Sequence, residues 1–210
     1  MKITKFGHSC LFVEEGDARI LIDPGNYSTV PALEKLDAIL ITHIHQDHVS
    51  IDTLKKLIEL NPRARIFSNE EVHIALVTED IEVDRLGDKE MAVVQNVIIE
   101  GVGKDHALIH KSIPLVKNTG YFIANKFFYP GDALTIPNRP VEIMAFPAMA
   151  PWMTLGQSID YALAVKPAVA FPVHDALLKV GGLYHASLEK YFTEVGTKWV
   201  VLEEGESKEF

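Results

Sequence analysis

Four side chains that bind metal ions well lie within six consecutive residues, in the stretch Thr42-His43-Ile44-His45-Gln46-Asp47-His48. His43 and His45 are two residues apart, so in an extended segment both imidazoles point to the same side and can reach one ion. Asp47 and His48 follow where the chain turns, and their side chains can face a second ion. Two ions about 3.5–4 Å apart can hold the attacking and departing oxygens of a hydrolysis. The spacing therefore indicates a metal site suited to hydrolysis.

The segments on either side of this motif predict how it is held. Asp37-Ala38-Ile39-Leu40-Ile41 is apolar and β-branched, which is typical of a buried strand. After the motif, Ile51, Leu54, Leu57 and Ile58 recur three and four residues apart, which predicts a helix. The ligands then lie on a strand-to-helix loop at the edge of a sheet, where α/β proteins place functional residues. A histidine-rich, solvent-exposed loop is the alternative.

The pattern Thr-His-x-His-x-Asp-His after an apolar strand resembles the signature of the metallo-β-lactamase superfamily. Gly7-His8-Ser9 and the small size resemble its small single-domain branch, which contains ascorbate-phosphate lactonase and related hydrolases. The resemblance implies an α/β fold, a four-layer αββα sandwich of two mixed β-sheets flanked by helices. We expect residues 1–210 to form one such domain.

The same resemblance implies ligands further along the chain, each at the end of an apolar strand. Seven metal ligands are implied in all: His43, His45 and His106 on one ion, Asp47, His48 and His174 on the other, and Asp132 bridging the two. His110 is the alternative to His106. We favour His106 because it lies closer to the end of the strand. Gly131-Asp132 alone also suits a plain turn. His174 before Asp175 also suits the start of a helix.

Four further residues are candidates for supporting a ligand or contacting substrate: His8, Asp23, His110 and Trp152. Asp23 ends an apolar strand, and the resemblance implies that it lies beneath the metal loop, although an aspartate before Pro-Gly also suits a turn. His8 either lines the active site or is purely structural. Trp152 lies in an irregular loop and either forms a pocket wall or covers the core. His110 either contacts substrate, orients a ligand or is a surface residue.

These groups predict a metal-dependent hydrolase. Imidazole and carboxylate ligands suit two divalent ions, zinc first, with manganese or iron also compatible. Two cations lower the pKa of a shared water and give a bridging hydroxide. Asp47, the expected catalytic residue, would orient this hydroxide, receive the proton of the water and pass it to the leaving group. The expected substrate is a small lactone, ester or phosphoester; a phosphodiesterase or nuclease-type hydrolase is the alternative. Di-iron flavoprotein relatives in this superfamily replace a histidine of the metal motif with glutamate and carry a flavin domain. Residue 45 is a histidine here and we expect a single domain, so the resemblance disfavours a di-iron redox protein. A non-catalytic metal-binding protein would not need all seven groups.

Composition narrows the partners. The chain has 210 residues, 48% of them hydrophobic, and a net charge of −9, which disfavours nucleic acid as a partner. Cys10 is the single cysteine, and no apolar run approaches the roughly 20 residues of a membrane helix. The start of the chain lacks the apolar region of a signal peptide. We therefore expect a cytoplasmic protein that acts on a small molecule and makes no membrane contact; a homo-oligomer is compatible with the sequence.

Apolar runs and turn residues predict the other elements. Helices are expected around 51–58, after caps at Asn69 and Thr154, and over 183–192. Strands are expected at 2–6, 10–14, 18–22, 37–41, 64–68, 91–95, 97–102, 120–124, 126–129, 141–146, 167–173 and 198–202.

Overall fold

The computed structural model describes residues 1–210, and its strands form two sheets of seven strands each. The first sheet contains β1 (Lys2–Lys5), β2 (Leu11–Glu15), β3 (Ala18–Ile22), β4 (Ala38–Leu40), β5 (Arg65–Ser68), β6 (Asp84–Arg85) and β14 (Ser207–Glu209). The second contains β7 (Met91–Val94), β8 (Val97–Val102), β9 (Gly120–Ile123), β10 (Phe127–Tyr129), β11 (Ile143–Pro147), β12 (Val169–Val173) and β13 (Lys198–Trp199). The helices are α1 (Ile51–Leu60), α2 (Glu70–Val77), α3 (Leu155–Val165) and α4 (Gly181–Glu194).

Both sheets are mixed. The first has the strand order β14-β1-β2-β3-β4-β5-β6, antiparallel from β14 to β3 and parallel from β3 to β6. The second has the order β13-β12-β11-β10-β9-β8-β7, antiparallel from β7 to β10 and parallel from β10 to β13. Neighbouring parallel strands need a crossover connection, and each of the four helices provides one.

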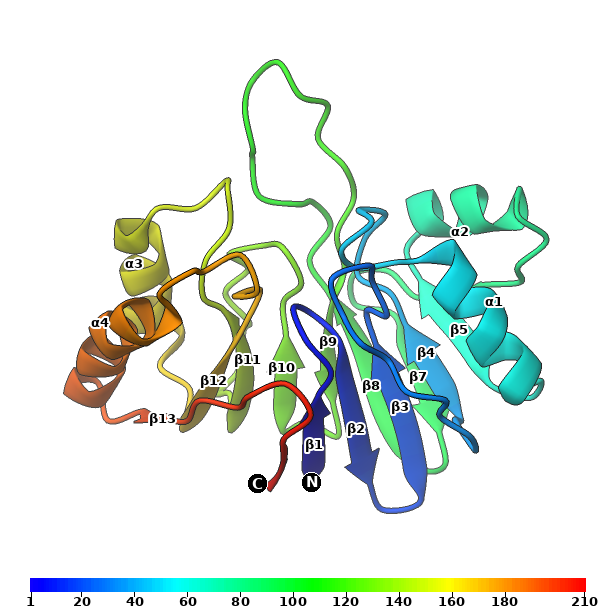
Figure 1. The fold of residues 1–210 in the computed structure, drawn as a ribbon, viewed down its shortest axis with the longest axis horizontal. Coiled ribbons are helices and arrows are strands. Elements are labelled where there is room, and N and C mark those ends of the chain that lie inside the picture. The colour runs from blue at the N-terminus through cyan, green and yellow to red at the C-terminus, as the bar shows by residue number, and fades with distance from the viewer.

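The crossovers place the helices on the outer faces of the two sheets. In Figure 1, α1 and α2 cover the first sheet on one side of the molecule, and α3 and α4 cover the second on the other. The order of layers is therefore helix, sheet, sheet, helix, which confirms the αββα sandwich predicted from the sequence. None of the four helices combines the length and the hydrophobicity needed to cross a membrane.

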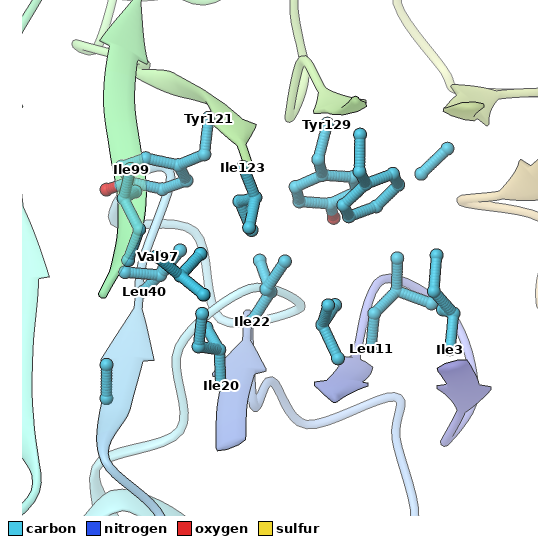
Figure 2. Packing of buried hydrophobic residues seen from close by; sticks show 14 of the residues in the cluster. Ile3, Leu11, Ile20, Ile22, Leu40, Val97, Ile99, Tyr121, Ile123 and Tyr129 are labelled. Carbon is cyan, nitrogen blue, oxygen red and sulfur yellow. The ribbon is translucent and has the colours of Figure 1, made fainter. Parts of the chain in front are cut away.

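The main core lies between the two sheets and contains 22 buried residues (Figure 2). Ile20 and Ile22 enter it from the first sheet, and Tyr121 and Ile123 enter it from the second. Leu21 points the other way, into the separate core beneath α1 and α2. Because successive strand residues face opposite sides of a sheet, a strand covered on both faces is apolar at consecutive positions.

The C-terminal end of the chain departs from the prediction. The strand expected over 198–202 is limited to Lys198–Trp199, and the chain then crosses to the first sheet. There Ser207–Glu209 pairs with β1, with Lys2 opposite Glu209, so the two termini lie side by side (Figure 1). This edge strand carries polar, largely exposed side chains, so it is defined only by its backbone hydrogen bonds to β1. Its sequence has no hydrophobic pattern from which a strand could be predicted.

Candidate metal centre

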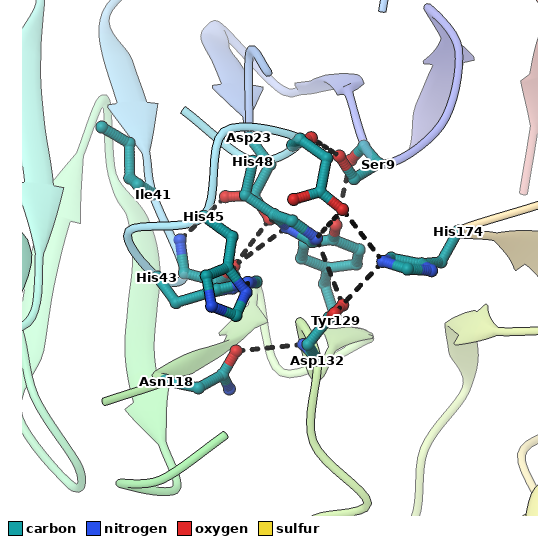
Figure 3. A network of polar contacts seen from close by, with 12 residues as sticks. Ser9, Asp23, Ile41, His43, His45, His48, Asn118, Tyr129, Asp132 and His174 are labelled. Carbon is teal, nitrogen blue, oxygen red and sulfur yellow. Dashed lines mark hydrogen bonds and ion pairs between the residues drawn. The ribbon is translucent and has the colours of Figure 1, made fainter. Parts of the chain in front are cut away.

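Every residue predicted to bind or support a metal, apart from His110 and Trp152, lies just beyond the C-terminal end of a strand. The loop between β4 and α1 carries His43, His45, Asp47 and His48. The other strand ends supply the remaining side chains: His8 after β1, Asp23 after β3, His106 after β8, Asp132 after β10 and His174 after β12. The two sheets therefore bring residues that are far apart in sequence to one edge of the sandwich (Figure 3).

The first predicted ligand set comes together as a compact group. His43, His45 and His106 each offer a nitrogen, and these atoms lie within 4.8 Å of one another. Nε2 of His43 is 3.1 Å from Nδ1 of His45. His110, the alternative third ligand, is exposed on the following loop, and its Nδ1 lies 2.7 Å from the Ser112 hydroxyl instead. The geometry thus favours His106 over His110.

The second predicted set is arranged around the carboxylate of Asp47. Its Oδ2 lies 3.3 Å from Nε2 of His174 and 3.9 Å from Nε2 of His48. Asp132 lies between the two sets, with Oδ1 3.2 Å from Nε2 of His48. Oδ2 of Asp132 is 3.1 Å from Nε2 of His174 and 3.4 Å from Nε2 of His106. Asp132 therefore contacts histidines of both predicted sets.

His8 belongs to the same cluster, although the sequence left its role open. The residue is fully buried, and its Nε2 lies 3.4 Å from Oδ2 of Asp47. His8, Asp47 and His174 also form a group whose possible ligand atoms lie within 4.8 Å of one another. The backbone N–H of His174 donates to the carbonyl of His8 at 2.6 Å, which ties the two residues together. His8 is thus a further candidate ligand or contact of the second ion.

Asp23 lies beneath the loop between β4 and α1 and contacts both the predicted ligand His48 and the loop backbone. Oδ2 of the fully buried Asp23 is 2.7 Å from Nδ1 of His48. The Thr42 backbone N–H and hydroxyl donate to the two carboxylate oxygens at 2.8 and 2.7 Å. A carboxylate on the far nitrogen of a histidine fixes the tautomer and leaves Nε2 free for a metal. Asp23 therefore orients His48.

Other supporting residues were missed by the sequence reasoning. Oδ1 of Asn118 accepts from the backbone N–H of Asp132 at 3.0 Å, which fixes the predicted bridging residue. The Ser9 hydroxyl donates to the carbonyl of Asp47 at 2.5 Å, and the Tyr129 hydroxyl donates to the carbonyl of Ser9 at 3.0 Å. Ser9 is the last residue of the Gly7-His8-Ser9 motif, but nothing in the local sequence marks Asn118 or Tyr129. Their role depends on strand ends that only the fold brings together.

Two glycines allow the backbone to pass close to this network. A Cβ at Gly25 would overlap the backbone carbonyl of Asp47, so only glycine lets the loop after β3 pack against the metal motif. Gly131 has φ +63°, and a Cβ there would collide with the side chains of Asn118 and Thr42. The Gly-Asp motif therefore has a steric reason: the glycine lets the chain turn into the cluster, so that Asp132 reaches its centre.

The charges in the metal-free cluster are strongly coupled. Burial alone would lower the pKa of His174, but the nearby carboxylates of Asp132 and Asp47 raise it to about 9. Burial likewise opposes protonation of His48, yet Asp132 and Asp23 hold the pKa of His48 well above its usual value. Burial would raise the pKa of Asp132, but His174 and His48 keep it well below the ordinary range. Positive imidazolium groups thus face a negative carboxylate where cations are expected.

Several buried atoms in the cluster have no hydrogen-bond partner, and they are the atoms that a metal would take. They are Nε2 of His8, His48, His106 and His174, and Oδ1 of Asp132. A buried polar atom without a partner costs about 1–3 kcal/mol, so such atoms are rare unless an ion or water satisfies them. Imidazole nitrogens and carboxylate oxygens in this mixture suit zinc, iron or manganese. The residues present therefore fit a pair of divalent ions.

Trp152 approaches the cluster from the loop between β11 and α3. Its indole Nε1 donates to Oδ2 of Asp132 at 2.9 Å, and its ring centroid is 5.5 Å from that of His106 in an edge-to-face arrangement. The side chain is half-buried. The predicted alternatives for this residue were a pocket wall and a cover for the core. Its contacts place it beside the cluster, where it also lines a surface pocket.

Known proteins share this sequence pattern and this fold. A family model described as "Beta-lactamase superfamily domain" matches residues 2–174. The chain is 37% identical over 201 residues to Protein Rv0786c of Mycobacterium tuberculosis, covering 92% of this chain and 93% of that protein. A shorter match of 58 residues is 48% identical to the UPF0173 metal-dependent hydrolase mll0680 of Mesorhizobium japonicum and covers 24% of each chain.

A solved structure extends the likeness to the whole fold. Igni18, described as a metallo hydrolase from the archaeon Ignicoccus hospitalis, has a TM-score of 0.75 and 23% identity, and the match covers 100% of this chain and 98% of that one. The family model covers most of the sequence, and the observed sandwich agrees with it. The chain therefore belongs to the metallo-β-lactamase superfamily of metal-dependent hydrolases.

Proposed function

We propose that this protein is a hydrolase that uses two divalent metal ions, zinc being the best match, to cleave small lactones, esters or phosphoesters. Two groups would hold the ions, His43, His45 and His106 on one side and Asp47, His48 and His174 on the other, with Asp132 between them. The observation that carries the proposal is the set of buried, unpartnered Nε2 and Oδ1 atoms around Asp132. Relatives named as metal-dependent hydrolases support the same class.

When bound, the ions would lower the pKa of a water to near neutrality and stabilise the negative charge that develops on the substrate oxygen. The chain's own residues supply the rest. Asp47 is the carboxylate best placed to meet a substrate, because its side chain is 22% exposed whereas that of Asp132 is 3% exposed. Burial would raise the pKa of Asp47, but the nearby imidazole rings of His174 and His8 keep it low. Oδ2 of Asp47 would orient the nucleophilic water, accept its proton and pass it to the leaving group.

His8 and Asp23 would act through these groups. Nε2 of His8 lies 3.4 Å from Oδ2 of Asp47 and holds that carboxylate in place from the buried side. Asp23 keeps Nδ1 of His48 occupied. The Gly7-His8-Ser9 segment, which resembles the lactonase branch, thus has a physical role at the centre: His8 positions Asp47, and Ser9 fixes the Asp47 backbone. This supports a lactone or ester as the first substrates to test.

The direct test combines metal content with turnover. Purified protein should bind close to two zinc ions per chain, measured by elemental analysis after removal of free metal. The loaded protein should hydrolyse at least one member of a panel of lactones, carboxylic esters, thioesters and phosphodiesters, and chelation should abolish that activity. A folded preparation that binds no transition metal would contradict the proposal. Turnover of phosphodiesters alone would favour the phosphodiesterase alternative.

A further inference from the structure

A surface pocket of about 430 Å³ lies beside the metal centre. Its apolar lining consists of Ala107, Leu108, Ala133, Leu134 and Trp152. This volume falls in the range of about 300–1,000 Å³ that is typical of small-molecule sites. Its apolar groups come from three separate segments, the loops after β8, β10 and β11, so the fold rather than one local turn creates it.

Two lining residues of the pocket are sequence neighbours of predicted ligands. Ala107 follows His106 and Ala133 follows Asp132, and the backbone N–H of Ala107 donates to the carbonyl of Asp132 at 2.8 Å. Trp152 belongs to both sites, since its indole lines the pocket while its Nε1 binds Asp132. The pocket and the predicted metal centre therefore share the Trp152 side chain.

The charge of the lining residues indicates which kind of chemical group the pocket suits. The polar lining residues are Asp105, Thr135 and Gln157, with no lysine, arginine or histidine among them. The one charged member, Asp105, is paired with Lys117 at 2.7 Å. A phosphate or sulfate group is normally recognised by arginine, lysine or free backbone N–H groups. This pocket offers an indole and aliphatic side chains instead, so it suits an uncharged hydrocarbon group.

We propose that this pocket binds the apolar group of the substrate, so that the preferred substrates are esters or lactones bearing a hydrocarbon chain or ring. Phosphorylated substrates fit it poorly. The inference rests on the proposed hydrolytic function and narrows it to one substrate class. It assigns specificity to Leu108 and Trp152. Leu108 lies in the segment between β8 and β9, which forms the tall green loop in Figure 1, and the residue is 63% exposed.

Kinetics of zinc-loaded protein on para-nitrophenyl acetate, butyrate and hexanoate test the proposal. Burial of each added methylene should raise kcat/KM by roughly fourfold. Leu108→Ser should lower kcat/KM for the hexanoate by about fivefold to tenfold and leave the acetate within about twofold. Leu115→Ser is the matched control, because Leu115 lies on the same loop, is 50% exposed and does not line the pocket. It should keep the full dependence on chain length.

A binding measurement makes the test independent of turnover. The chain has two tryptophans, and Trp199→Phe leaves Trp152 as the only one. Titration of the zinc-loaded Trp199→Phe protein with butanol, hexanol and octanol should change the emission of Trp152, with tighter binding for each longer alcohol. Leu108→Ser should weaken this binding, whereas Leu115→Ser should not. If Trp199→Phe does not fold, the same titration of the native chain serves, because Trp199 is buried against Phe192.

The outcomes distinguish the assignment of the pocket from the proposed hydrolytic function. A flat dependence on chain length together with no binding of alcohols would overturn the pocket assignment while leaving a hydrolase in place. Equal effects of Leu108→Ser and Leu115→Ser, or a preference for phosphorylated substrates, would also overturn it. Alcohol binding that depends on Leu108 in a protein that hydrolyses nothing in the panel would support the pocket and contradict the proposed function.

Discussion

The indole N–H of Trp152 donates to Oδ2 of Asp132, the residue that lies between the two predicted ligand sets, at 2.9 Å. This contact joins the loop that walls the pocket to the carboxylate on which both sets converge. Asp132 is almost fully buried, with its side chain 3% exposed, and its backbone N–H is held by Asn118. Asp132 is therefore held at its main chain by Asn118 and at its carboxylate by Trp152.

Trp152→Phe should weaken zinc binding by roughly tenfold, because groups that orient a ligand typically contribute that much to affinity. Phenylalanine keeps an aromatic wall and removes only the N–H donor. The preference for longer acyl chains should therefore survive while metal affinity falls. Competition with a chromophoric chelator measures the affinity, and Trp199→Phe is the matched control. Unchanged zinc affinity in Trp152→Phe would show that the hydrogen bond does not position Asp132.

Asp23→Asn should lower zinc affinity by roughly tenfold to a hundredfold, since the change removes the charge that holds Nδ1 of His48. Asp23 has φ 48°, a left-handed conformation that asparagine also tolerates, so the backbone is expected to stay in place. Asp17→Asn, on an exposed turn, is the control and should leave affinity unchanged. Calorimetric titration with zinc measures both, and equal affinities would argue against a supporting role for Asp23.

Gly131→Ala should destabilise the fold more than Gly16→Ala. Both glycines have positive φ, +63° and +56°, so both substitutions carry a similar backbone cost of about 1–2 kcal/mol. Gly16 has open space around it, whereas a Cβ at Gly131 meets Asn118 and Thr42. The additional strain at Gly131 should appear as a lower free energy of unfolding in urea. Equal losses for the two variants would mean that the loop relaxes around the new methyl group.

Most of the scaffold was predictable because its signals are local. Strand Ala18–Ile22 was predicted with its observed bounds, and the caps Asn69 and Thr154 begin α2 and α3 as expected. Continuous apolar runs identify strands that are buried on both faces. A side-chain oxygen at the N-cap accepts a hydrogen bond from a backbone N–H two or three residues further on, which marks the start of a helix. The strand Ser207–Glu209 had no such signal, because an edge strand of polar residues is defined by its partner alone.

The site was predictable where residues form a motif and obscure where they act alone. His43, His45, Asp47 and His48 identify themselves by their spacing. A lone histidine such as His8 has no neighbour in sequence that reveals its partner, and only the packing of β1 near the end of β12 brings its ring centroid to 4.0 Å from that of His174. The choice of His106 over His110 from the sequence rested only on the distance from the strand end; the fold adds that His106 is buried and His110 exposed.

His106→Ala and His110→Ala should behave differently although the two residues are four positions apart. His106 is buried with its Nε2 unpartnered beside Asp132, so its loss should remove close to one zinc per chain. His110 is exposed and contacts Ser112, so its loss should leave the metal content unchanged. Elemental analysis of both variants, after checking their folding by circular dichroism, decides the assignment. Loss of zinc only in His110→Ala would reverse it.

Zinc binding to the metal-free protein should release protons at neutral pH. Burial opposes protonation of His174, but Asp132 and Asp47 raise its pKa to about 9 from 6.5. A protonated imidazole cannot bind metal, so an ion bound by His174 must displace its proton, and apparent zinc affinity at that site should rise between pH 6.5 and 9. The pKa of His174 is higher in the folded metal-free protein than in the unfolded chain, so protonated His174 stabilises the metal-free fold below pH 6.5. This stabilisation is lost as the pH rises through 9. The Tm of metal-free protein should therefore fall over that range, while zinc-loaded protein should not lose stability from this group. Calorimetry in buffers of different ionisation enthalpy counts the protons, and a heat of binding independent of buffer would contradict the prediction.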